Sequence, residues 1–475
     1  MISKKLNLKK LLVQSALLIT ITAFSSCKDE FIQLKGDDTS KYEIANLSGQ
    51  LVGQGGKALM SNFDFQNEGS YKFNIQLNKN STGVGTGKLI YDETVLNSYN
   101  QKNGTNFIAY PKDLVEFINA GAVNIPAGSN VSDKIEVKIK ANTAANPADV
   151  FVIPVKANFN ASGSNVDNLD YLLFVKDLTK GASAEKSTGL KTFSIIEVNN
   201  VNPLMNLAFT LKNSGKPLFD HVVLFSSNIN FDENTGRVYI NHNENLTHIL
   251  QNRDKYIKPL QDRGIKVSLS LLGNHDKSGV SNLSDETIKY FAQEIKRTCD
   301  AYGLDGVFYD DEYSAYKDPA PAGFEKPSNS RAAKLMYEVK KLMPHRDNMV
   351  YVYSNTDYFG NTPWGNYGID EAEAGEYVDY AIHDYFGNYD LTESYPGLDK
   401  KRWIMLSSEY ARNYFTSISS LRGVRANGQG GTMVFSLNPH NSNVASQLNH
   451  MRNIATAFYD DELVYDAAKA FRKDW

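Results

Sequence analysis

Two patterns of hydrophobic and polar residues divide the chain. Between about residues 43 and 192, short segments alternate apolar with polar positions, as in residues 71–77 and 135–139. Turns rich in Asn, Gly and Ser separate these segments, and little helical periodicity occurs. Because successive side chains of a strand point to opposite faces, this pattern is typical of strands with one buried face. It predicts an all-β sandwich domain over residues 43–192.

Strand-like and helix-like segments alternate in the rest of the chain, which predicts βα units around a parallel sheet over residues 200–475. Eight strands in about 275 residues is the usual content of a (β/α)₈ TIM barrel. An open doubly wound sheet fits less well, because no glycine-rich phosphate loop follows the first strand. We expect the eight strands near residues 203–209, 221–228, 265–272, 304–309, 348–354, 377–382, 402–406 and 432–437.

Length and charge narrow the class of protein. A chain of 475 residues is too long for one ordinary core, in agreement with two domains. Its net charge is −4, and Lys and Arg are scattered without a basic stripe. This argues against nucleic acid as a partner.

The N-terminus predicts export. Lysines precede an apolar run over residues 11–24, and the small residues Ser25 and Ser26 lead to Cys27. Such a run is a secretory signal, too short and wrongly flanked to span a membrane. Residues 24–27 resemble a bacterial lipoprotein box, which implies lipidation of Cys27, and residues 28–30 resemble the acidic export tag of surface lipoproteins. We expect a signal over residues 1–27, a tether over 28–42, and a lipid anchor in the outer membrane that exposes the protein at the cell surface. A secretory peptide with an incidental cysteine is the alternative.

An apolar run meets a cluster of carboxylates in residues 304–313, LDGVFYDDEY. Strand alternation puts Phe308, Asp310 and Glu312 on one face, with the two acids roughly 7 Å apart. Close carboxylates in a partly dry site cannot both ionise easily, so one of them becomes a general acid near neutral pH. Glu312, nearest the mouth, is the candidate. An acidic strand end that caps a helix, pairs with lysines or binds a cation is the alternative.

This stretch resembles the Asp-Gly-x-Asp-x-Asp-x-Glu signature of glycoside hydrolase family 18, which lies on the fourth strand of a TIM barrel. Residues 228–230, 265–275 and 385–387 are, with it, most similar to the family's single-domain endo-β-N-acetylglucosaminidases. Those enzymes cut between the two core N-acetylglucosamines of N-linked glycans. The sequence departs from the signature at Phe308, where the family usually has Asp. An apolar ring under Asp310 would raise the pKa of that acid by desolvation and removes a charged support.

The resemblance implies a retaining mechanism in which the N-acetyl oxygen of the substrate attacks the anomeric carbon. Glu312 would protonate the glycosidic oxygen and later deprotonate water. Asp310 would hold the acetamido nitrogen, and Tyr385 would hydrogen-bond the acetamido oxygen. Asp305, whose side chain is expected on the opposite face of the strand from Asp310 and Glu312, would have a structural role in supporting the strand. We expect no metal and no other cofactor, and an N-linked glycan or glycoprotein, of high-mannose type, as the substrate.

Polar residues recur directly after the predicted strands, where a TIM barrel builds its site. Each of them alone could be a loop residue satisfied by backbone, but their recurrence at the same strand end favours a site. After the seventh strand, this polar residue is Glu409 or Arg412. The candidate substrate-binding residues are Asn228, Asn274, His275, Asn355, Asp384 and Asn438.

Two other functions stay open at this point. Phe308 motivates a glycan-binding surface lipoprotein without activity, although Asp310, Glu312 and Tyr385 are kept. A chitinase-type hydrolase would keep the chemistry, but the chain has only three tryptophans to build aromatic platforms, and tyrosines would have to replace them.

The sequence also indicates a role for the β domain, the state of Cys299 and the number of subunits. Residues 125–128, Ile-Pro-Ala-Gly, resemble a turn of small immunoglobulin-like domains, which implies a spacer role for the β domain. Cys299 continues a helical apolar stripe and is expected to be a buried structural thiol. A monomer is the expected state.

Overall fold

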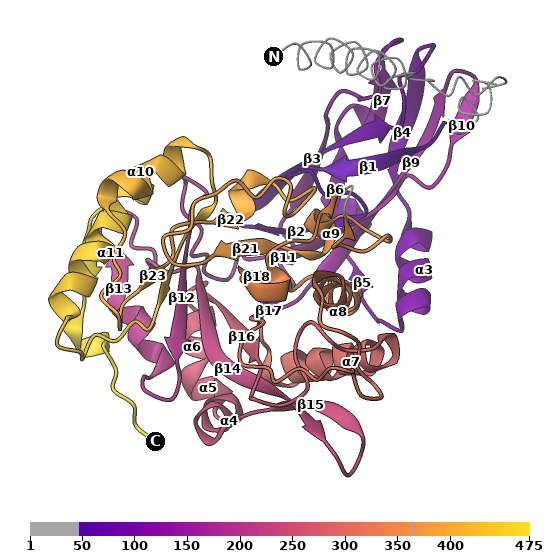
Figure 1. Cartoon of the computed structure of the whole chain (residues 1–475). Helices are drawn as coiled ribbons and strands as arrows, with labels where there is room; N and C mark the ends of the chain where they lie inside the picture. The colour runs from indigo at the N-terminus through magenta and orange to yellow at the C-terminus, as the bar shows by residue number, and fades with distance from the viewer. Residues whose placement is uncertain (1–46, 363–364) are drawn as a thin grey trace, which may run out of the picture. The chain divides into compact units, whose positions relative to one another are not determined.

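The computed structural model describes residues 47–362 and 365–475 (Figure 1). The expected signal, the lipidation site Cys27 and the expected tether lie outside these residues. None of the helices in the described ranges has the length and apolar character needed to cross a membrane.

The N-terminal domain is rich in β-structure and contains two sheets. Ring contacts join the sheets, with centroids 5.1 Å apart for Phe73 and Tyr171 and 5.4 Å apart for Phe63 and Tyr71. In order across the first sheet, the strands are β1 (Gly49–Gly53), β3 (Glu68–Leu77), β8 (Ile135–Lys140) and β6 (Val115–Phe117). The second sheet has the order β2 (Met60–Phe65), β11 (Asp170–Asp177), β9 (Phe151–Ala161), β4 (Gly85–Tyr91) and β7 (Ala122–Ile125), with β5 (Ile108–Ala109) and β10 (Ser164–Val166) also paired to β9.

One helix, α3 (Glu93–Asn103), covers part of the second sheet. Its buried Leu96 belongs to an apolar cluster with Val152 and Phe174 of that sheet. The side chain of Asp92 caps the first turn by accepting a hydrogen bond from the amide of Thr94. This helix is an addition to the all-β pattern that alternation predicted.

The second domain is a closed parallel barrel, as predicted, and not an open sheet. Pairing of β12 with β24, with Ile195 opposite Phe435, closes the ring. Within the described residues the eight barrel strands are β12 (Lys191–Glu197), β14 (His221–Asp232), β16 (Lys266–Leu272), β17 (Gly306–Tyr309), β18 (Asp347–Val352), β21 (Tyr380–His383), β22 (Trp403–Ile404) and β24 (Gly431–Phe435).

The prediction of the first barrel strand at residues 203–209 is wrong. Pro203–Ala208 is a 3₁₀ helix, with Pro203 in its first turn and the side chain of Asn202 accepting a hydrogen bond from the amide of Leu204. The first strand is β12, which begins at Lys191 and so lies across the expected domain boundary at residue 192. After the helix, β13 (Phe209–Leu211) pairs with β25 (Leu463–Tyr465) outside the barrel.

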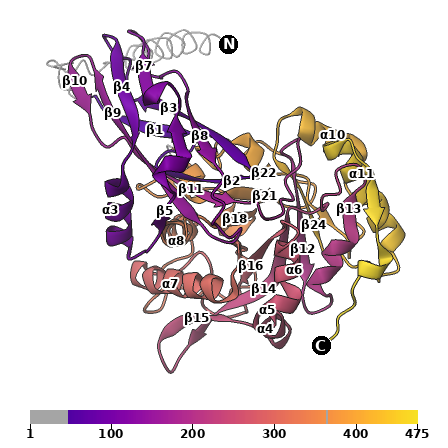
Figure 2. The same ribbon diagram turned by 180° about the vertical axis from the view of Figure 1, so that it is seen from behind.

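Helices surround the strands, and α7 (Asp285–Tyr302) and α8 (Asn329–Leu342) lie side by side (Figures 1 and 2). The helical segment between β14 and β16 is broken into α4 (Glu244–Gln251), α5 (Arg253–Tyr256) and α6 (Lys258–Gln261). Cys299 continues the buried stripe of α7 and is a free, fully buried thiol, whose burial raises its pKa to about 12. The later helices are α9 (Ala374–Tyr377), α10 (Ile418–Ala426) and α11 (Val444–Tyr459).

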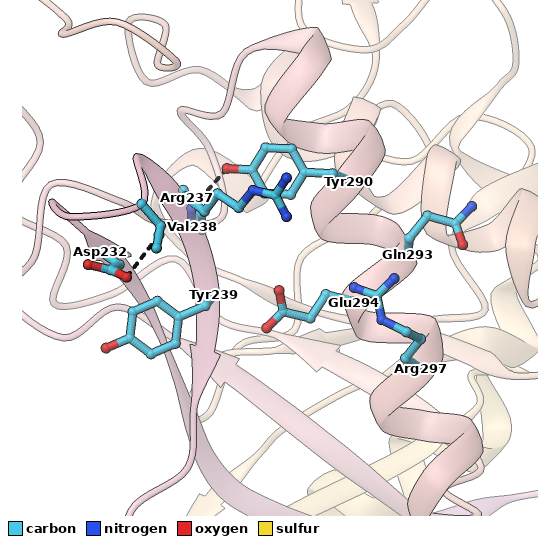
Figure 3. A pocket seen from close by; sticks show the side chains of 9 residues that line it. Asp232, Arg237, Val238, Tyr239, Tyr290, Gln293, Glu294 and Arg297 are labelled. Atoms are coloured by element: carbon cyan, nitrogen blue, oxygen red, sulfur yellow. Dashed lines mark hydrogen bonds between the residues drawn. The ribbon is translucent and has the colours of Figure 1, made fainter.

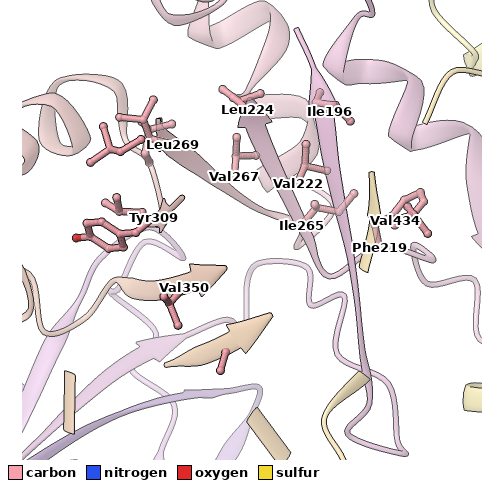
Figure 4. Close-up of a cluster of buried hydrophobic side chains, with 14 of the residues drawn as sticks. Ile196, Phe219, Val222, Leu224, Ile265, Val267, Leu269, Tyr309, Val350 and Val434 are labelled. Atoms are coloured by element: carbon pink, nitrogen blue, oxygen red, sulfur yellow. The ribbon is translucent and has the colours of Figure 1, made fainter. Parts of the chain in front are cut away.

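Two apolar clusters divide the side chains of the barrel strands. The larger one packs strands against helices and includes Val222, Leu224 and Tyr309 (Figure 4). The smaller one holds the intervening positions, among them Val223 and Phe308. Because alternate residues of a strand face opposite sides, Phe308 points to the inside of the barrel and Tyr309 to the helices.

Buried ion pairs join the two domains within the compact unit Gly49–Trp475. The carboxylate of Asp379, which precedes β21, receives Lys57 of the β domain at 2.8 Å and Lys340 of α8 at 2.6 Å. Arg402 approaches the same carboxylate at 3.2 Å. Burial alone would raise the pKa of Asp379, but the charges of Lys340, Lys57 and Arg402 hold it well below its ordinary value.

Candidate active site

Strand β17 brings Asp310 and Glu312 to the carboxyl end of the barrel. The amide of Asp310 continues the sheet by donating to the carbonyl oxygen of Leu271 at 3.1 Å. The Asp310 side chain is only 4% exposed, and its Oδ1 has no hydrogen-bond partner among the described residues. Glu312, two residues on, is half-buried. The site therefore holds one buried carboxyl group with a free oxygen beside a second that solvent can reach.

The environment favours the protonated form of both acids. Burial raises the pKa of Asp310 well above its ordinary value, and the charges of Glu312, Asp311 and Asp384 raise it further. Burial also raises the pKa of Glu312, and Asp384 adds to this, while a hydrogen bond with Tyr313 and the charge of Arg412 oppose it. A carboxyl group that keeps its proton near neutral pH can act as a general acid.

Asp311 has a different position from its two neighbours. Its side chain is buried and accepts hydrogen bonds from the hydroxyl groups of Ser281, Tyr316 and Ser354. The side-chain amide of Asn355 donates to it at 2.8 Å. Asp311 thus connects the loops after the third and fifth strands to the end of β17. Asn355, predicted to bind substrate, directs its amide group to this carboxylate.

The sixth strand adds Asp384 and Tyr385 to the site. Asp384 accepts a hydrogen bond from the hydroxyl of Tyr351 and another from the backbone amide of Tyr385, the latter at 2.6 Å. Tyr385 donates its own hydroxyl to Oε2 of Glu409 at 3.0 Å. Because the charge of Asp384 acts on both Asp310 and Glu312, these groups form one electrostatic cluster.

The second and third strands supply amide groups beside this cluster. Asn228 donates its side-chain amide to the carbonyl oxygen of Gly273 at 3.0 Å. The exposed Asn274 donates its own to Asn230 at 3.1 Å. His275 is exposed, and its ring lies 5.8 Å from that of Tyr313, which directly follows Glu312. These three predicted residues lie at the same end of the barrel as the acids.

Two predicted residues have other surroundings. Asn438, after the eighth strand, accepts a hydrogen bond from the amide of His440 at 2.9 Å and so stabilises its own turn. Asp305 precedes β17, at the opposite end of this strand from Asp310. It accepts hydrogen bonds from the amide of Val267 at 2.9 Å and from Gln261 at 2.8 Å.

Sequence reasoning missed Tyr351 and gave Glu409 only as an alternative to Arg412. Tyr351 lies two residues after Met349 in β18, so both side chains point to the inside of the barrel, where Met349 belongs to the smaller apolar cluster. Strand alternation could therefore have identified Tyr351. Glu409 lies on the two-residue strand β23 (Ser408–Glu409), where no periodicity exists to show which way a side chain points. The structure brings both residues to the site, along with the charge of Arg412.

Left-handed backbone conformations mark the carboxyl ends of the barrel strands. Such φ values cost of order 1 kcal/mol or more in non-glycine residues and are typical of functional sites. They occur at His275 (φ 55°), Tyr313 (59°), Ser354 (52°), Phe386 (58°) and Ser436 (56°).

Exposed aromatic rings lie near these strand ends. Phe386 is 45% exposed and Tyr414 is 42% exposed, and their ring centroids are 5.5 Å apart. Tyr414 also contacts Tyr385, at 6.5 Å between centroids. Aromatic faces of this kind give sugar rings a stacking surface that the few tryptophans of the chain do not supply.

A pocket of about 350 Å³ lies elsewhere, between α7 and the hairpin of β14 with β15 (Arg237–Asn241) (Figure 3). Tyr290 and Glu294 of α7 accept hydrogen bonds from the backbone of β15. None of the acids of the cluster lines this pocket.

Comparisons with known proteins place the chain. A family model described as an N-terminal domain matches residues 50–163, in the β-rich domain. Endo-beta-N-acetylglucosaminidase F1 of Elizabethkingia meningoseptica is 53% identical over 287 residues, which are 60% of this chain and 83% of the relative. An endo-beta-N-acetylglucosaminidase of Flavobacterium sp. (strain SK1022) is 31% identical over 252 residues, 53% of this chain and 76% of the relative.

A solved structure is similar over both domains. EndoBT-3987 of Bacteroides thetaiotamicron, in a crystal structure with a Man5GlcNAc product, superposes with a TM-score of 0.80 at 28% identity. The match covers 90% of this chain and 99% of that one. A second crystal structure of the same protein, with a Man9GlcNAc2Asn substrate, superposes with a TM-score of 0.74. The acid pair on the fourth strand and these relatives lead to one conclusion: the chain belongs to the endo-β-N-acetylglucosaminidase family of glycoside hydrolases.

Proposed function

We propose that this enzyme hydrolyses the β-1,4 bond between the two core N-acetylglucosamines of N-linked glycans, with high-mannose glycans as its substrates. The observation that carries the proposal is the pair formed by buried Asp310 and half-buried Glu312 at the barrel mouth, with Asp384 and Tyr385 beside it. The glycans in the two EndoBT-3987 structures, Man5GlcNAc and Man9GlcNAc2Asn, support the choice of substrate.

The geometry supports a retaining, substrate-assisted mechanism of the family 18 kind. Glu312 is the acid that solvent and a glycosidic oxygen can both reach, so it donates the proton and later accepts one from water. Asp310 is held too deep for that role, and its carboxyl group, whose Oδ1 has no hydrogen-bond partner among the described residues, accepts the hydrogen bond of the acetamido nitrogen of the substrate. Attack by the acetamido oxygen then replaces an enzyme nucleophile. Tyr385 lies beside this position and hydrogen-bonds the acetamido oxygen.

Substitution of Glu312 by Gln tests this assignment. Glu312→Gln keeps the shape of the side chain and removes its proton, so turnover of a high-mannose glycopeptide should fall by at least ~10²-fold. Glu325→Gln is the matched control, because Glu325 is exposed on the loop after the same strand. A Glu312→Gln variant that releases glycan at the wild-type rate would remove Glu312 from the mechanism. Cleavage of chitin oligosaccharides but not of the glycopeptide would favour the chitinase-type alternative.

The location of the protein is proposed from the sequence alone. We infer that Cys27 is lipidated and that it anchors the enzyme as a monomer to the outer membrane, with the immunoglobulin-like β domain as a spacer between lipid and barrel. The basic and apolar segment before Cys27 supports this proposal. Radiolabelled palmitate should enter the wild-type protein in cells and not the Cys27→Ser variant. Equal labelling of the two would contradict the anchor.

A further inference from the structure

Glu197 is the last residue of β12, the first strand of the barrel. Ile195 belongs to the smaller apolar cluster, inside the barrel, whereas Ile196 and Val198 belong to the larger one, which packs against the helices. Because the side chains of a strand alternate between two faces, Glu197 points to the inside of the barrel. It is therefore the polar residue that the first strand contributes at the end of the barrel that holds the acids.

The protein supplies no partner for the Glu197 carboxyl group. Within residues 47–362 and 365–475, no group donates a hydrogen bond to it, and no lysine, arginine or histidine forms an ion pair with it. The side chain is half-buried, and burial raises its pKa above the ordinary value, with a further contribution from the charge of Glu409. A carboxyl group that loses water and gains no donor is unfavourable, so folding alone does not account for Glu197.

Glu409, whose charge acts on Glu197, is in contrast satisfied by the protein. It is only 3% exposed, on the short strand β23 beside the barrel strand β24. Its Oε1 accepts a hydrogen bond from the amide of Ala411 at 2.8 Å, and its Oε2 accepts one from the hydroxyl of Tyr385 at 3.0 Å. Of these two neighbouring acids, Glu197 is thus the one with free oxygens, and it lies on the side of the site where Tyr385 is.

Two phenylalanine rings flank Glu197 in the sheet. Phe225 of β14 is opposite Glu197 in the parallel pairing of β12 with β14. Phe435 of β24 is opposite Ile195, two residues before Glu197, and opposite Glu409 on its other side. Both rings are half-buried, and their centroids are 5.1 Å apart. This wall of the barrel therefore combines apolar surface with one free carboxyl group.

The wall lies across the barrel from the two acids of β17. Around the ring of strands, two strands separate β12 from β17 on one side and four on the other. A sugar whose acetamido group reaches buried Asp310 lies inside this ring, so its other groups face the remaining strands. Glu312 gives its proton to the leaving oxygen, so the sugar that stays on the protein lies on the side of β17. The released part of the glycan then lies towards Glu197, and its hydroxyl groups are the donors that this carboxyl group lacks.

We propose that Glu197 is a substrate-binding residue, whose carboxyl group accepts hydrogen bonds from hydroxyl groups of the released part of the glycan. The proposal rests on the proposed function, because it needs that glycan in the barrel mouth. Phe225 and Phe435 offer apolar surface to the sugar and keep water away from these bonds. Glu197 touches no reacting atom, so it adds to the affinity for the glycan and not to the rate of the chemical step.

Kinetics and product binding of Glu197→Gln in the full chain test this role. Glutamine keeps the size of the side chain and loses its charge, so KM for a high-mannose glycopeptide should rise about 10-fold, with kcat little changed. The affinity for Man5GlcNAc, measured by isothermal titration calorimetry, should fall by a similar factor. The melting temperature without glycan should not decrease, because Glu197 has no partner in the protein to lose. Glu325→Gln, exposed on the loop after β17, is the matched control and should leave KM and affinity unchanged.

The binding measurement needs no turnover, so it separates this proposal from the proposed function. A wild-type chain that binds Man5GlcNAc and releases no glycan contradicts the proposed function, and the loss of that binding in Glu197→Gln still supports Glu197. An unchanged KM and an unchanged affinity in Glu197→Gln would overturn the role of Glu197, even where the wild type releases glycan.

Two other results would also overturn it. A fall in kcat with KM unchanged, or a variant that melts at a lower temperature than the wild type, would show that Glu197 acts through the structure of the site and not through contact with the glycan. If Glu197→Gln does not fold, Glu197→Asp withdraws the carboxyl group by one methylene and is measured in the same way. It should raise KM as well, and an unchanged KM would contradict the contact.

Discussion

The amide of Gly273, after the third barrel strand, donates a hydrogen bond to the carbonyl oxygen of Glu312 at 3.0 Å. This bond joins the neighbouring loop to the backbone of Glu312, the proposed general acid. A Cβ atom at Gly273 would collide with that carbonyl oxygen and with the side chain of Ser314. The absence of a side chain at residue 273 is therefore what lets the two loops meet.

Gly273→Ala should consequently displace Glu312 and lower activity. A shift of about 1 Å in a catalytic group can cost up to ~10²-fold in rate, so kcat should fall between about 10- and 100-fold. Steady-state kinetics on a high-mannose glycopeptide measure it. Gly423→Ala in α10 is the control, since a Cβ there meets nothing within 4 Å and should leave kcat unchanged. Equal rates for Gly273→Ala and the wild type would show that the loop contact does not place the acid.

Asp310→Asn should stabilise the fold while abolishing turnover. The folded state raises the pKa of Asp310, so above the unfolded value of about 3.9 it retains a proton that the unfolded chain has lost. Asp310 therefore lowers stability increasingly as the pH rises from that value through its folded pKa. The gain in melting temperature from Asp310→Asn should be larger at pH 7 than at pH 4. If Asp310→Asn melted at a lower temperature than the wild type at pH 7, burial of the ionised Asp310 carboxylate would not be destabilising.

Asp379→Asn should destabilise the protein strongly, because it leaves the buried amines of Lys57 and Lys340 without their counter-charge. Removing one partner of a buried pair costs about 3–5 kcal/mol. Folding lowers the pKa of Asp379 below the unfolded value of about 3.9. The stability that its ionised carboxylate adds to the wild type is therefore fully present above pH 4 and is lost as the pH falls through the folded pKa.

Thermal unfolding between pH 3 and 7 measures this difference. Lys212→Ala is the control, because the pair between Lys212 and Glu462 is largely exposed. It should not change the melting temperature. A difference between Asp379→Asn and the wild type that stays constant over this pH range would show that charge is not its cause.

Arg412→Gln should shift the pH dependence of activity. The charge of Arg412 lowers the pKa of Glu312 against the effect of burial, so its removal should raise that pKa. Glu312 then stays protonated to higher pH, and the basic limb of the pH profile of kcat should shift to higher pH. Because Arg412 is exposed, high salt should reduce the difference from the wild type. A basic limb that moves to lower pH would contradict this arrangement of charges.

Strong local patterns predicted most of the barrel. Strand alternation placed Phe308 inside and Tyr309 outside, and it brought Asp310 and Glu312 to the same end of the strand. Strand alternation did not identify β12 as the first barrel strand. This apolar strand directly follows the β domain, so no change of pattern marks the start of the barrel. The turn rich in apolar residues at Pro203–Ala208 had the composition of a strand, but its proline and the Asn202 cap start a 3₁₀ helix.

The loops were harder to predict than the strands. The hydrogen bond between Tyr385 and Glu409 joins residues 24 positions apart, and nothing in the spacing of either residue indicates it. Asn355 was expected to face substrate because it follows a strand, whereas its amide is directed to Asp311. Contacts of this kind depend on how separate loops pack, which local periodicity does not encode.

Mass spectrometry of a high-mannose glycoprotein incubated with the enzyme shows which glycosidic bond is cleaved. The product should be a protein that retains one N-acetylglucosamine at each occupied asparagine, with the rest of the glycan released intact. The same incubation with Glu312→Gln should leave the glycoprotein unchanged over that time. A wild-type digest in which the asparagines carry no sugar, or in which every glycan remains whole, would contradict cleavage within the glycan core.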